Sequence, residues 1–210
     1  LPLVDKSLTE LEKLELLPFK KAMDAGVDLL MTAHIQYPQI EKDQVVSKET
    51  GEKIYVPATL SDDILTGLVR KKYGYKGVIV SDAMGMDAIA KNFGEVEAVK
   101  MAIKAGVDLV LMPTTLRSKT DLTKIDTIVD EVVRAVQTGD ISEERLNESV
   151  RRILTLKEKR GVLNFDPSAR TPEKAEEAVG STLNRDLERK IAAAAVTVVK
   201  NEDHTLPFKV

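Results

Sequence analysis

The chain has 210 residues, of which 43% are hydrophobic and 31% charged, which is enough apolar material for the buried core of a globular protein. Its formal net charge of -3 comes from interleaved acidic and basic residues, which excludes the one-signed field that gathers nucleic acid or anionic lipid. Cysteine is absent, which excludes disulfides, thiolate metal sites and cysteine nucleophiles. The longest apolar stretch, Ile191–Val199, falls far short of the roughly 20 residues that span a bilayer, so we expect no membrane span.

In chain order, the first 112 residues predict a unit that occurs three times: a helix, a glycine and a short apolar strand. The helices are expected at 8–25, 61–73 and 95–105, and the strands that follow them at 27–31, 78–80 and 107–112. Two more amphipathic helices are expected at 122–136 and 142–160.

Fully apolar strands that alternate with helices predict an α/β fold with parallel strands covered by helices, either a (β/α) barrel or a doubly wound sheet. Three strands are fewer than the eight of a complete barrel, so we expect the chain to be part of a barrel whose other strands lie N-terminal to it. The polar loop Gly161–Pro172 predicts a domain boundary near Asp166. Residues 1–166 are then the first domain, and the remainder, Glu173–Val210, is a helical stretch too short to be an independent domain.

Reactive groups in parallel α/β folds gather beyond the carboxyl ends of the strands, which here are Thr32–His34, Ser81–Asp82 and Pro113–Thr114. Asp82 is the carboxylate placed directly at a strand end, where it could serve in catalysis or cap a helix over Ala83–Ala90. His34 could donate a hydrogen bond to a ligand or to Asp82, or be an ordinary loop histidine. His204, in a polar turn, is read as structural or exposed. The sequence has no GxGxxG, Walker or HExxH motif, so nothing supports a nucleotide or metal site.

Four segments resemble glycoside hydrolase family 3, and they occur in that family's order. The segment KKYGYKGVIVSDAMGMDAI, Lys71–Ile89, resembles the signature around the family's nucleophile. The other three segments are LLMTAHIQYP (Leu29–Pro38), PATLSDDILTGLVR (Pro57–Arg70) and AGVDLVLMP (Ala105–Pro113). The ending AVTVVKNEDHTLPF, Ala195–Phe208, is similar to the start of the family's second domain, an α/β sandwich.

The resemblance implies that residues 1–166 are the C-terminal portion of a (β/α)8 TIM-type barrel, and that residues 167–210 are a linker and the beginning of a second domain. It also implies that Asp82 is the catalytic nucleophile. His34, Met84 and Met86 would be substrate-binding residues. The TAHI form of the strand exit resembles the β-N-acetylglucosaminidase (β-hexosaminidase) branch of the family. That branch takes its general acid/base from an Asp-His pair on a loop that follows a Lys-His-Phe-Pro-Gly-His-Gly motif, and this motif does not occur in the chain.

The implied function is retaining hydrolysis of terminal β-linked N-acetylhexosamine from oligosaccharides or peptidoglycan fragments such as muropeptides, without metal or organic cofactor. Because the acid/base is missing from the chain, we expect these residues alone to be inactive. The implied location is extracellular or in the envelope of a bacterium, with a cytoplasmic location still open. The alternatives are an inert scaffold half that needs a complementing N-terminal half, a β-glucosidase-type member, and a barrel aldolase. An aldolase would need a Schiff-base lysine, which none of the three strand exits carries.

Overall fold

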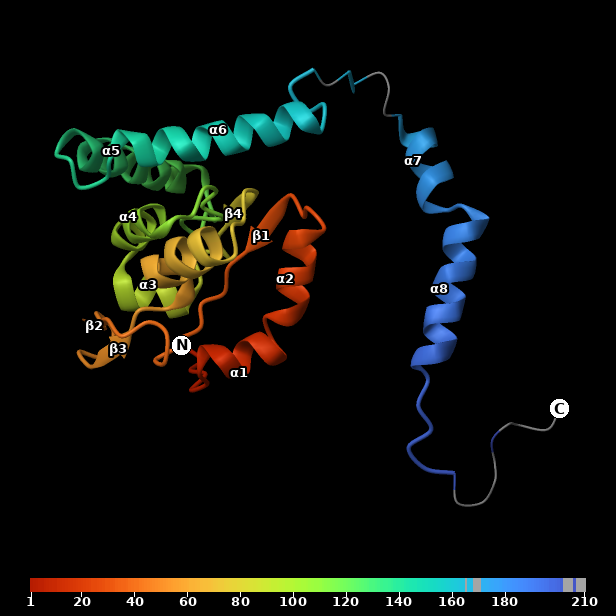
Figure 1. Ribbon diagram of the computed structural model, residues 1–210. Coiled ribbons are helices and arrows are strands. Elements are labelled where there is room, and N and C mark those ends of the chain that lie inside the picture. Colours follow the sequence, from red (N-terminus) through yellow and green to blue (C-terminus); the bar gives the residue numbers. More distant parts are fainter. Residues whose placement is uncertain (165, 168–170, 202–205, 207–210) are drawn as a thin grey trace. The chain divides into compact units, whose positions relative to one another are not determined.

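The computed structural model describes residues 1–164, 166–167, 171–201 and 206. It divides into two compact units, Leu1–Leu163 and Asn164–Val210, and the sequence analysis places a boundary after Asp166. Unit 1 alternates helices with short strands, so the protein is of the mixed α/β class (Figure 1). Its elements in chain order are α1 (Leu8–Lys13), α2 (Leu17–Asp24), β1 (Leu29–Met31), β2 (Gln44–Val46), β3 (Lys53–Tyr55), η1 (Ala58–Leu60), η2 (Asp63–Lys72), β4 (Val78–Val80), α3 (Asp87–Phe93), α4 (Glu95–Ala105), η3 (Lys119–Asp121), α5 (Leu122–Gln137) and α6 (Glu143–Lys159).

The first predicted helix, 8–25, is wrong in one respect, because the structure breaks it into α1 and α2. Pro18 stands in the first turn of α2. A proline ring collides with the carbonyl group four residues earlier, and that residue, Leu14, is where α1 ends. The second predicted helix is present as η2, which has π-type turns, for example from the Tyr73 N–H to the Leu68 carbonyl at 2.9 Å. Ser61 caps its start as predicted, since its hydroxyl accepts the Ile64 N–H at 3.1 Å.

The predicted parallel strands are present as β1 and β4, which pair from Leu29–Val78 to Met31–Val80. The third predicted strand, 107–112, is wrong as a continuous strand. This segment meets β4 at one parallel bridge, between Val80 and Leu109. Beyond it, the carbonyls of Leu111 and Met112 turn toward the loop that follows β4 and accept hydrogen bonds there.

A short antiparallel hairpin of β2 and β3 was not predicted. Its turn contains Gly51 at a φ of 75°, which suits glycine. The Ser47 hydroxyl next to β2 donates to Asn92 of α3 at 2.6 Å, and this bond holds the hairpin against α3.

The hydrophobic core lies on one face of the parallel strands. Ile79 and Val107 pack there with side chains from η2 and α4, such as Leu65 and Ala102. The opposite face is apolar and only partly covered. Val78 is buried there, whereas Leu29 (44% exposed), Met31 (52%), Leu109 (37%) and Leu111 (38%) are exposed. Parallel sheets are normally covered on both faces, so this exposed face is an unusual feature of unit 1.

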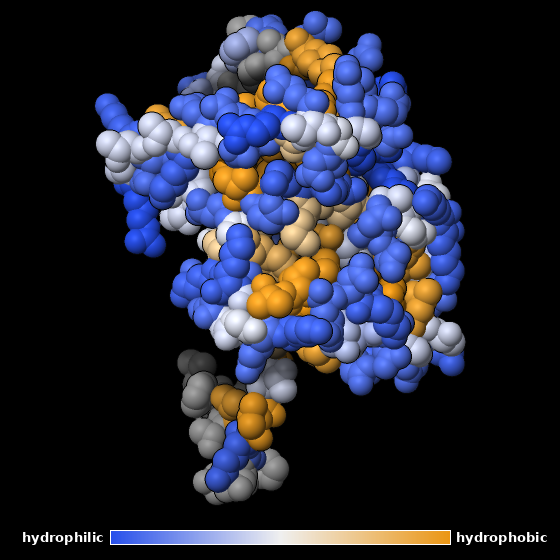
Figure 2. All heavy atoms as spheres, turned by 90° about the vertical axis from the view of Figure 1, so that its left-hand side faces the viewer, coloured by the Kyte–Doolittle hydropathy of each residue, from blue (hydrophilic) through white to orange (hydrophobic). Residues whose placement is uncertain are grey.

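Further apolar side chains are exposed on helices α5 and α6. They include Val129, Val133, Val150 and Leu154. On the face shown in Figure 2, hydrophilic side chains cover much of the surface and apolar side chains show between them.

Helix α6 crosses the amino ends of the strands. Its Arg145 donates to the Val107 carbonyl at 3.0 Å, and at its other end Lys159 pairs with Asp28, next to β1, at 3.0 Å. Between these contacts, α6 supplies three of the partners of Asp108, whose side chain is fully buried.

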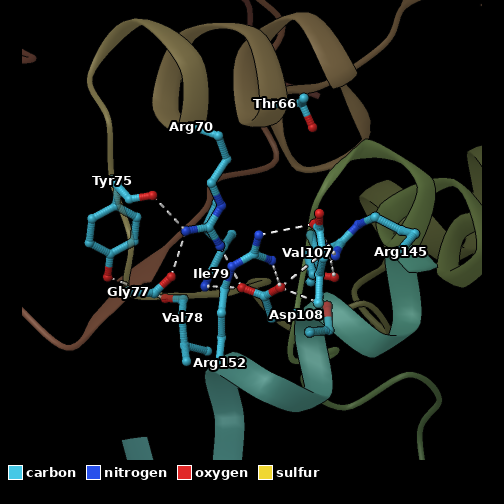
Figure 3. Close-up of polar contacts among 12 residues, drawn as sticks. Thr66, Arg70, Tyr75, Gly77, Val78, Ile79, Val107, Asp108, Arg145 and Arg152 are labelled. Carbon is cyan, nitrogen blue, oxygen red and sulfur yellow. Dashed lines mark hydrogen bonds and ion pairs between the residues drawn. The ribbon is translucent and has the colours of Figure 1, made fainter. Parts of the chain in front are cut away.

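Asp108 is the centre of a polar cluster at this end of the strands (Figure 3). Arg70, Arg145 and Arg152 approach its carboxylate at 2.5, 3.2 and 2.9 Å. The Ser149 hydroxyl and the Ile79 N–H also donate to it, at 2.6 and 2.9 Å. Burial alone would raise the pKa of Asp108, but these hydrogen bonds and the neighbouring guanidinium groups lower it below its ordinary value. Asp108 is therefore a buried carboxylate that stays ionised.

Unit 2 contains α7 (Pro172–Val179) and α8 (Thr182–Ala195), capped by the hydroxyls of Thr171 and Ser181. Of the predicted segment Ala195–Phe208, residues 202–205 and 207–208, with His204, lie outside the described residues. None of the helices in the part of the chain that the structure describes has the length and apolar character to cross a membrane.

Candidate active site

The predicted strand exits lie side by side at the carboxyl ends of β1, β4 and the 107–112 segment. The Thr32 N–H donates to the Val80 carbonyl at 2.9 Å, and the Ser81 N–H donates to the Leu109 carbonyl at 3.0 Å. These bonds bring His34 and Asp82, 48 residues apart in sequence, to the same edge of the sheet. At the third exit, the hydroxyl of the buried Thr114 is already engaged, because it donates to Glu95 of α4 at 2.8 Å.

Asp82 follows β4 directly and is partly exposed. Its Oδ1 atom accepts the N–H of Ala83 at 2.7 Å. Within the described residues no protein group donates to its other oxygen, Oδ2. The alternative of a helix cap is wrong, because α3 begins five residues later, at Asp87, with Met86 in the capping position. Asp82 is thus a carboxylate on a fixed backbone with one oxygen open to a ligand.

The turn Asp82–Met86 is held by the neighbouring segment. The N–H groups of Met84 and Gly85 donate to the carbonyls of Leu111 and Met112 at 3.0 and 2.9 Å. Met112 adopts a left-handed φ of 43° to present its carbonyl, a conformation that is uncommon for a residue other than glycine. A Cβ atom at Gly85 would meet the hydroxyl of Thr115 at 3.1 Å, so the close approach of the two segments favours glycine there.

His34 is buried, with 6% of its surface exposed. Its Nδ1 lies 3.0 Å from the hydroxyl of Thr59, and its Nε2 lies 3.1 Å from the carbonyl oxygen of Ala83. The Thr59 hydroxyl is also 2.8 Å from that of Thr32. The imidazole therefore connects the exit of β1, η1 and the turn after β4.

The two methionines of the turn have different surroundings. Met84 is fully buried and packs in the hydrophobic core beneath the turn. Met86 is 47% exposed and lies at the start of α3. Of the two, Met86 is the side chain that a ligand could touch without rearrangement of the core.

Sequence reasoning did not identify Thr59 as part of the site. This residue is fully buried in η1, 25 positions from its partner His34. Thr59 lies inside the segment Pro57–Arg70 that resembles family 3, but no spacing rule connects a threonine there to a histidine after β1.

The arrangement is suited to nucleophilic or general-base chemistry by a carboxylate, because Asp82 is rigidly held and has a free oxygen. Within the described residues, no group of three or more His, Asp or Glu side chains could hold a metal ion.

Comparison with known families gives one match over most of unit 1. The sequence model of the "Glycosyl hydrolase family 3 N terminal domain" matches residues 1–156. The resemblance expected from the four motifs is thereby confirmed, and with it a fold of the TIM-barrel type for the matched domain.

Two curated relatives match along most of the chain. The beta-hexosaminidase A of Pseudoalteromonas piscicida is 36% identical over 210 residues, which is 100% of this chain and 34% of the relative. The beta-N-acetylglucosaminidase/beta-glucosidase of Cellulomonas fimi is 29% identical over 193 residues, 90% of this chain and 31% of the relative. The chain thus spans about a third of the length of these relatives.

Among solved structures, the chain resembles a glycoside hydrolase family 3 beta-N-acetylglucosaminidase from Paenibacillus sp. str. FPU-7. The TM-score is 0.66 and the identity 39%, over 77% of this chain and 28% of that one.

Proposed function

Because the chain belongs to glycosyl hydrolase family 3, whose N-terminal domain it matches, we propose that it carries the nucleophile part of a retaining β-N-acetylhexosaminidase active site. The observation that carries the proposal is the position of Asp82. Its carboxylate stands at the end of a parallel strand with Oδ1 fixed by Ala83 and Oδ2 open.

In the proposed reaction, Asp82 Oδ2 attacks the anomeric carbon of a β-linked N-acetylhexosamine while a proton donor protonates the departing glycosidic oxygen. The bond from the anomeric carbon to that oxygen breaks, and a glycosyl ester of Asp82 forms. Water, deprotonated by the former donor, then attacks the same carbon and releases the sugar and the carboxylate. The two successive inversions retain the configuration of the substrate. No cofactor takes part in this scheme.

We place the proton donor, and the strands that complete the barrel, in segments outside these 210 residues. The exposed apolar face of Leu29, Met31, Leu109 and Leu111 supports this placement, because such a face on a parallel sheet is normally covered. In the same proposal, residues 1–166 form the C-terminal part of the barrel and residues 167–210 begin a second domain. Met86 borders the sugar, and Met84 supports the turn from below.

The substrate class is proposed to be β-N-acetylglucosaminides, including peptidoglycan fragments, and the location to be outside the bacterial cytoplasm. The names of the relatives from Pseudoalteromonas piscicida and Paenibacillus support the N-acetyl sugar. The double name of the Cellulomonas fimi relative keeps a β-glucosidase activity as the second candidate.

The protein expressed from its complete coding sequence is expected to hydrolyse an aryl β-N-acetylglucosaminide faster than the matching aryl β-glucoside, with kcat/KM higher by tenfold or more, on the order of what hydrogen bonds to one substituent supply. Proton NMR of the first turnover should detect the β-anomer of the released sugar, because retention follows from a covalent intermediate. The α-anomer as first product would contradict the retaining mechanism. A preference for the glucoside would favour the second candidate.

The 210-residue chain, purified alone and assayed on the same aryl β-N-acetylglucosaminide, is expected to give no turnover above the rate of its Asp82→Asn variant. The physical reason is the missing proton donor, without which the leaving oxygen departs as an anion. Circular dichroism and a thermal unfolding transition should accompany the assay, so that inactivity is measured on folded material. Robust turnover by the wild-type chain would place the donor within these residues.

A further inference from the structure

For a neutral imidazole, the directions of the hydrogen bonds around His34 follow from the donors and acceptors that surround it. The Ala83 carbonyl oxygen can only accept, so His34 Nε2 carries a hydrogen and donates to it over 3.1 Å. In the neutral ring Nδ1 is then an acceptor, and the Thr59 hydroxyl donates to it over 3.0 Å. Thr59 has thereby used its only proton, so its oxygen accepts the hydroxyl of Thr32 over 2.8 Å. In this buried series of hydrogen bonds, Thr32 donates to Thr59, Thr59 donates to His34, and His34 donates to Ala83.

Both ring nitrogens of His34 are therefore engaged by the protein. With 6% of its surface exposed, the imidazole has neither a free nitrogen nor the access that a hydrogen bond to a sugar would require. This geometry argues against the sugar contact expected for His34 from the sequence.

What His34 holds is the peptide group between Ala83 and Met84. The carbonyl oxygen of this peptide accepts from His34, and its N–H donates to the Leu111 carbonyl at 3.0 Å. One peptide plane is thus fixed from two sides, by the exit of β1 and by the 107–112 segment. The N–H of the same Ala83 donates to Asp82 Oδ1 at 2.7 Å.

We infer that His34 is a positioning residue, which sets the direction of the Asp82 carboxylate through Ala83 and makes no contact with the sugar. The inference rests on the proposed function, since it assumes that Asp82 is the nucleophile. If the Ala83–Met84 peptide is released, the Ala83 N–H no longer holds Oδ1, and Oδ2 loses its fixed direction toward the anomeric carbon. A shift of about 1 Å in a reacting group can cost on the order of a hundredfold in rate.

Substitution of His34 by glutamine or asparagine tests the hydrogen bonds of the two ring nitrogens separately. In His34→Gln, the side-chain amide nitrogen reaches about as far as Nε2 and can still donate to the Ala83 carbonyl. In His34→Asn, the shorter side chain occupies the position of Nδ1, so it can satisfy Thr59 and leaves Ala83 without a donor. Both variants put an amide into the same cavity, and their stabilities can be compared by thermal unfolding.

In the protein expressed from its complete coding sequence, we expect His34→Asn to lower kcat by about 10- to 100-fold, with KM on an aryl β-N-acetylglucosaminide changed by less than about twofold. His34→Gln should stay within about fivefold of the wild-type kcat. Thr59→Val, which removes the donor to Nδ1 at nearly constant volume, should lie between the two. A sugar-binding histidine would instead raise KM in both amide variants, and that outcome would overturn the inference.

Labelling with a 2-fluoro glycoside distinguishes failure of this inference from failure of the proposed function. The label should attach to the Asp82 peptide in the wild type and, more slowly, in His34→Asn. If Asp82 is labelled at the same rate in both proteins, His34 does not position it. If the wild type is labelled on another residue, the nucleophile assignment itself fails.

Discussion

Substitution of Asp82 by asparagine is expected to lower kcat by at least about 10³-fold, because an amide cannot form the glycosyl ester. The loss should appear in the first half-reaction, formation of the glycosyl ester, so a 2-fluoro glycoside should leave the variant unlabelled in the intact mass spectrum. The fold should be little affected. The asparagine side-chain oxygen can still accept the Ala83 N–H that Asp82 accepts at 2.7 Å, so the free energy of unfolding should change by less than about 1 kcal/mol.

Asp87→Asn is the matched control for this experiment. Asp87 lies five residues away at the start of α3, its side chain is 80% exposed, and it pairs with Lys91 on the surface. This variant should be labelled and should turn over substrate like the wild type. A labelled, active Asp82→Asn protein would remove Asp82 from the mechanism, whatever its family resemblance.

Substitution of Asp108 by asparagine is expected to destabilise the protein by about 3–5 kcal/mol, because it leaves three guanidinium groups around a neutral side chain. Arg70, Arg145 and Arg152 all approach this buried carboxylate. The melting temperature should fall on the order of 10 °C for a unit of this size, measured by circular dichroism or calorimetry. Asp140→Asn is the control, since Asp140 forms an exposed pair with Lys104 at 2.7 Å and its loss should be barely measurable.

The loss in Asp108→Asn should also depend on pH in one direction. The pKa of Asp108 is lowered in the folded protein, so the stability that its charge contributes is present above the unfolded-state pKa of about 4. That contribution disappears as the pH falls through the lower folded-state pKa. Urea unfolding should therefore give a constant difference between variant and wild type from pH 5 to 7, and a smaller difference below pH 4. A difference that grows with acidity would show that the carboxylate is not stabilised as an ion.

Much of unit 1 follows from local sequence signals. Strand β4 and helix α4 have the predicted bounds, Val78–Val80 and Glu95–Ala105, because Gly77 precedes β4 and glycines flank α4 on both sides. Gly94 and Gly106 take positive φ angles of 81° and 123° on either side of α4, where other residues would be strained. The position of Asp82 at a strand exit follows from the same reasoning.

Other features depend on partners that are distant in sequence. The sequence analysis did not predict that Asp108 is a buried ion, since Arg70 and Arg152 lie 38 and 44 residues away from it and no periodicity relates them. The β2–β3 hairpin was missed because its strands have three residues each and only partial burial. The position of His34 at the end of β1 could be predicted from the sequence. The partners of its two ring nitrogens could not, because Thr59 and Ala83 lie 25 and 49 residues away.

The position of α6 across the amino ends of the strands also affects the order in which the protein folds. Lys159 pairs with Asp28 across 131 residues, so the ribosome must complete α6 before the start of β1 gains this contact. Until then, Asp108 has Arg70 as its cationic partner and lacks the groups that α6 supplies, so the buried ion cluster at the amino ends of the strands is incomplete. Contacts of such long sequence separation slow folding. Docking of α6 is therefore expected to be a late step in folding.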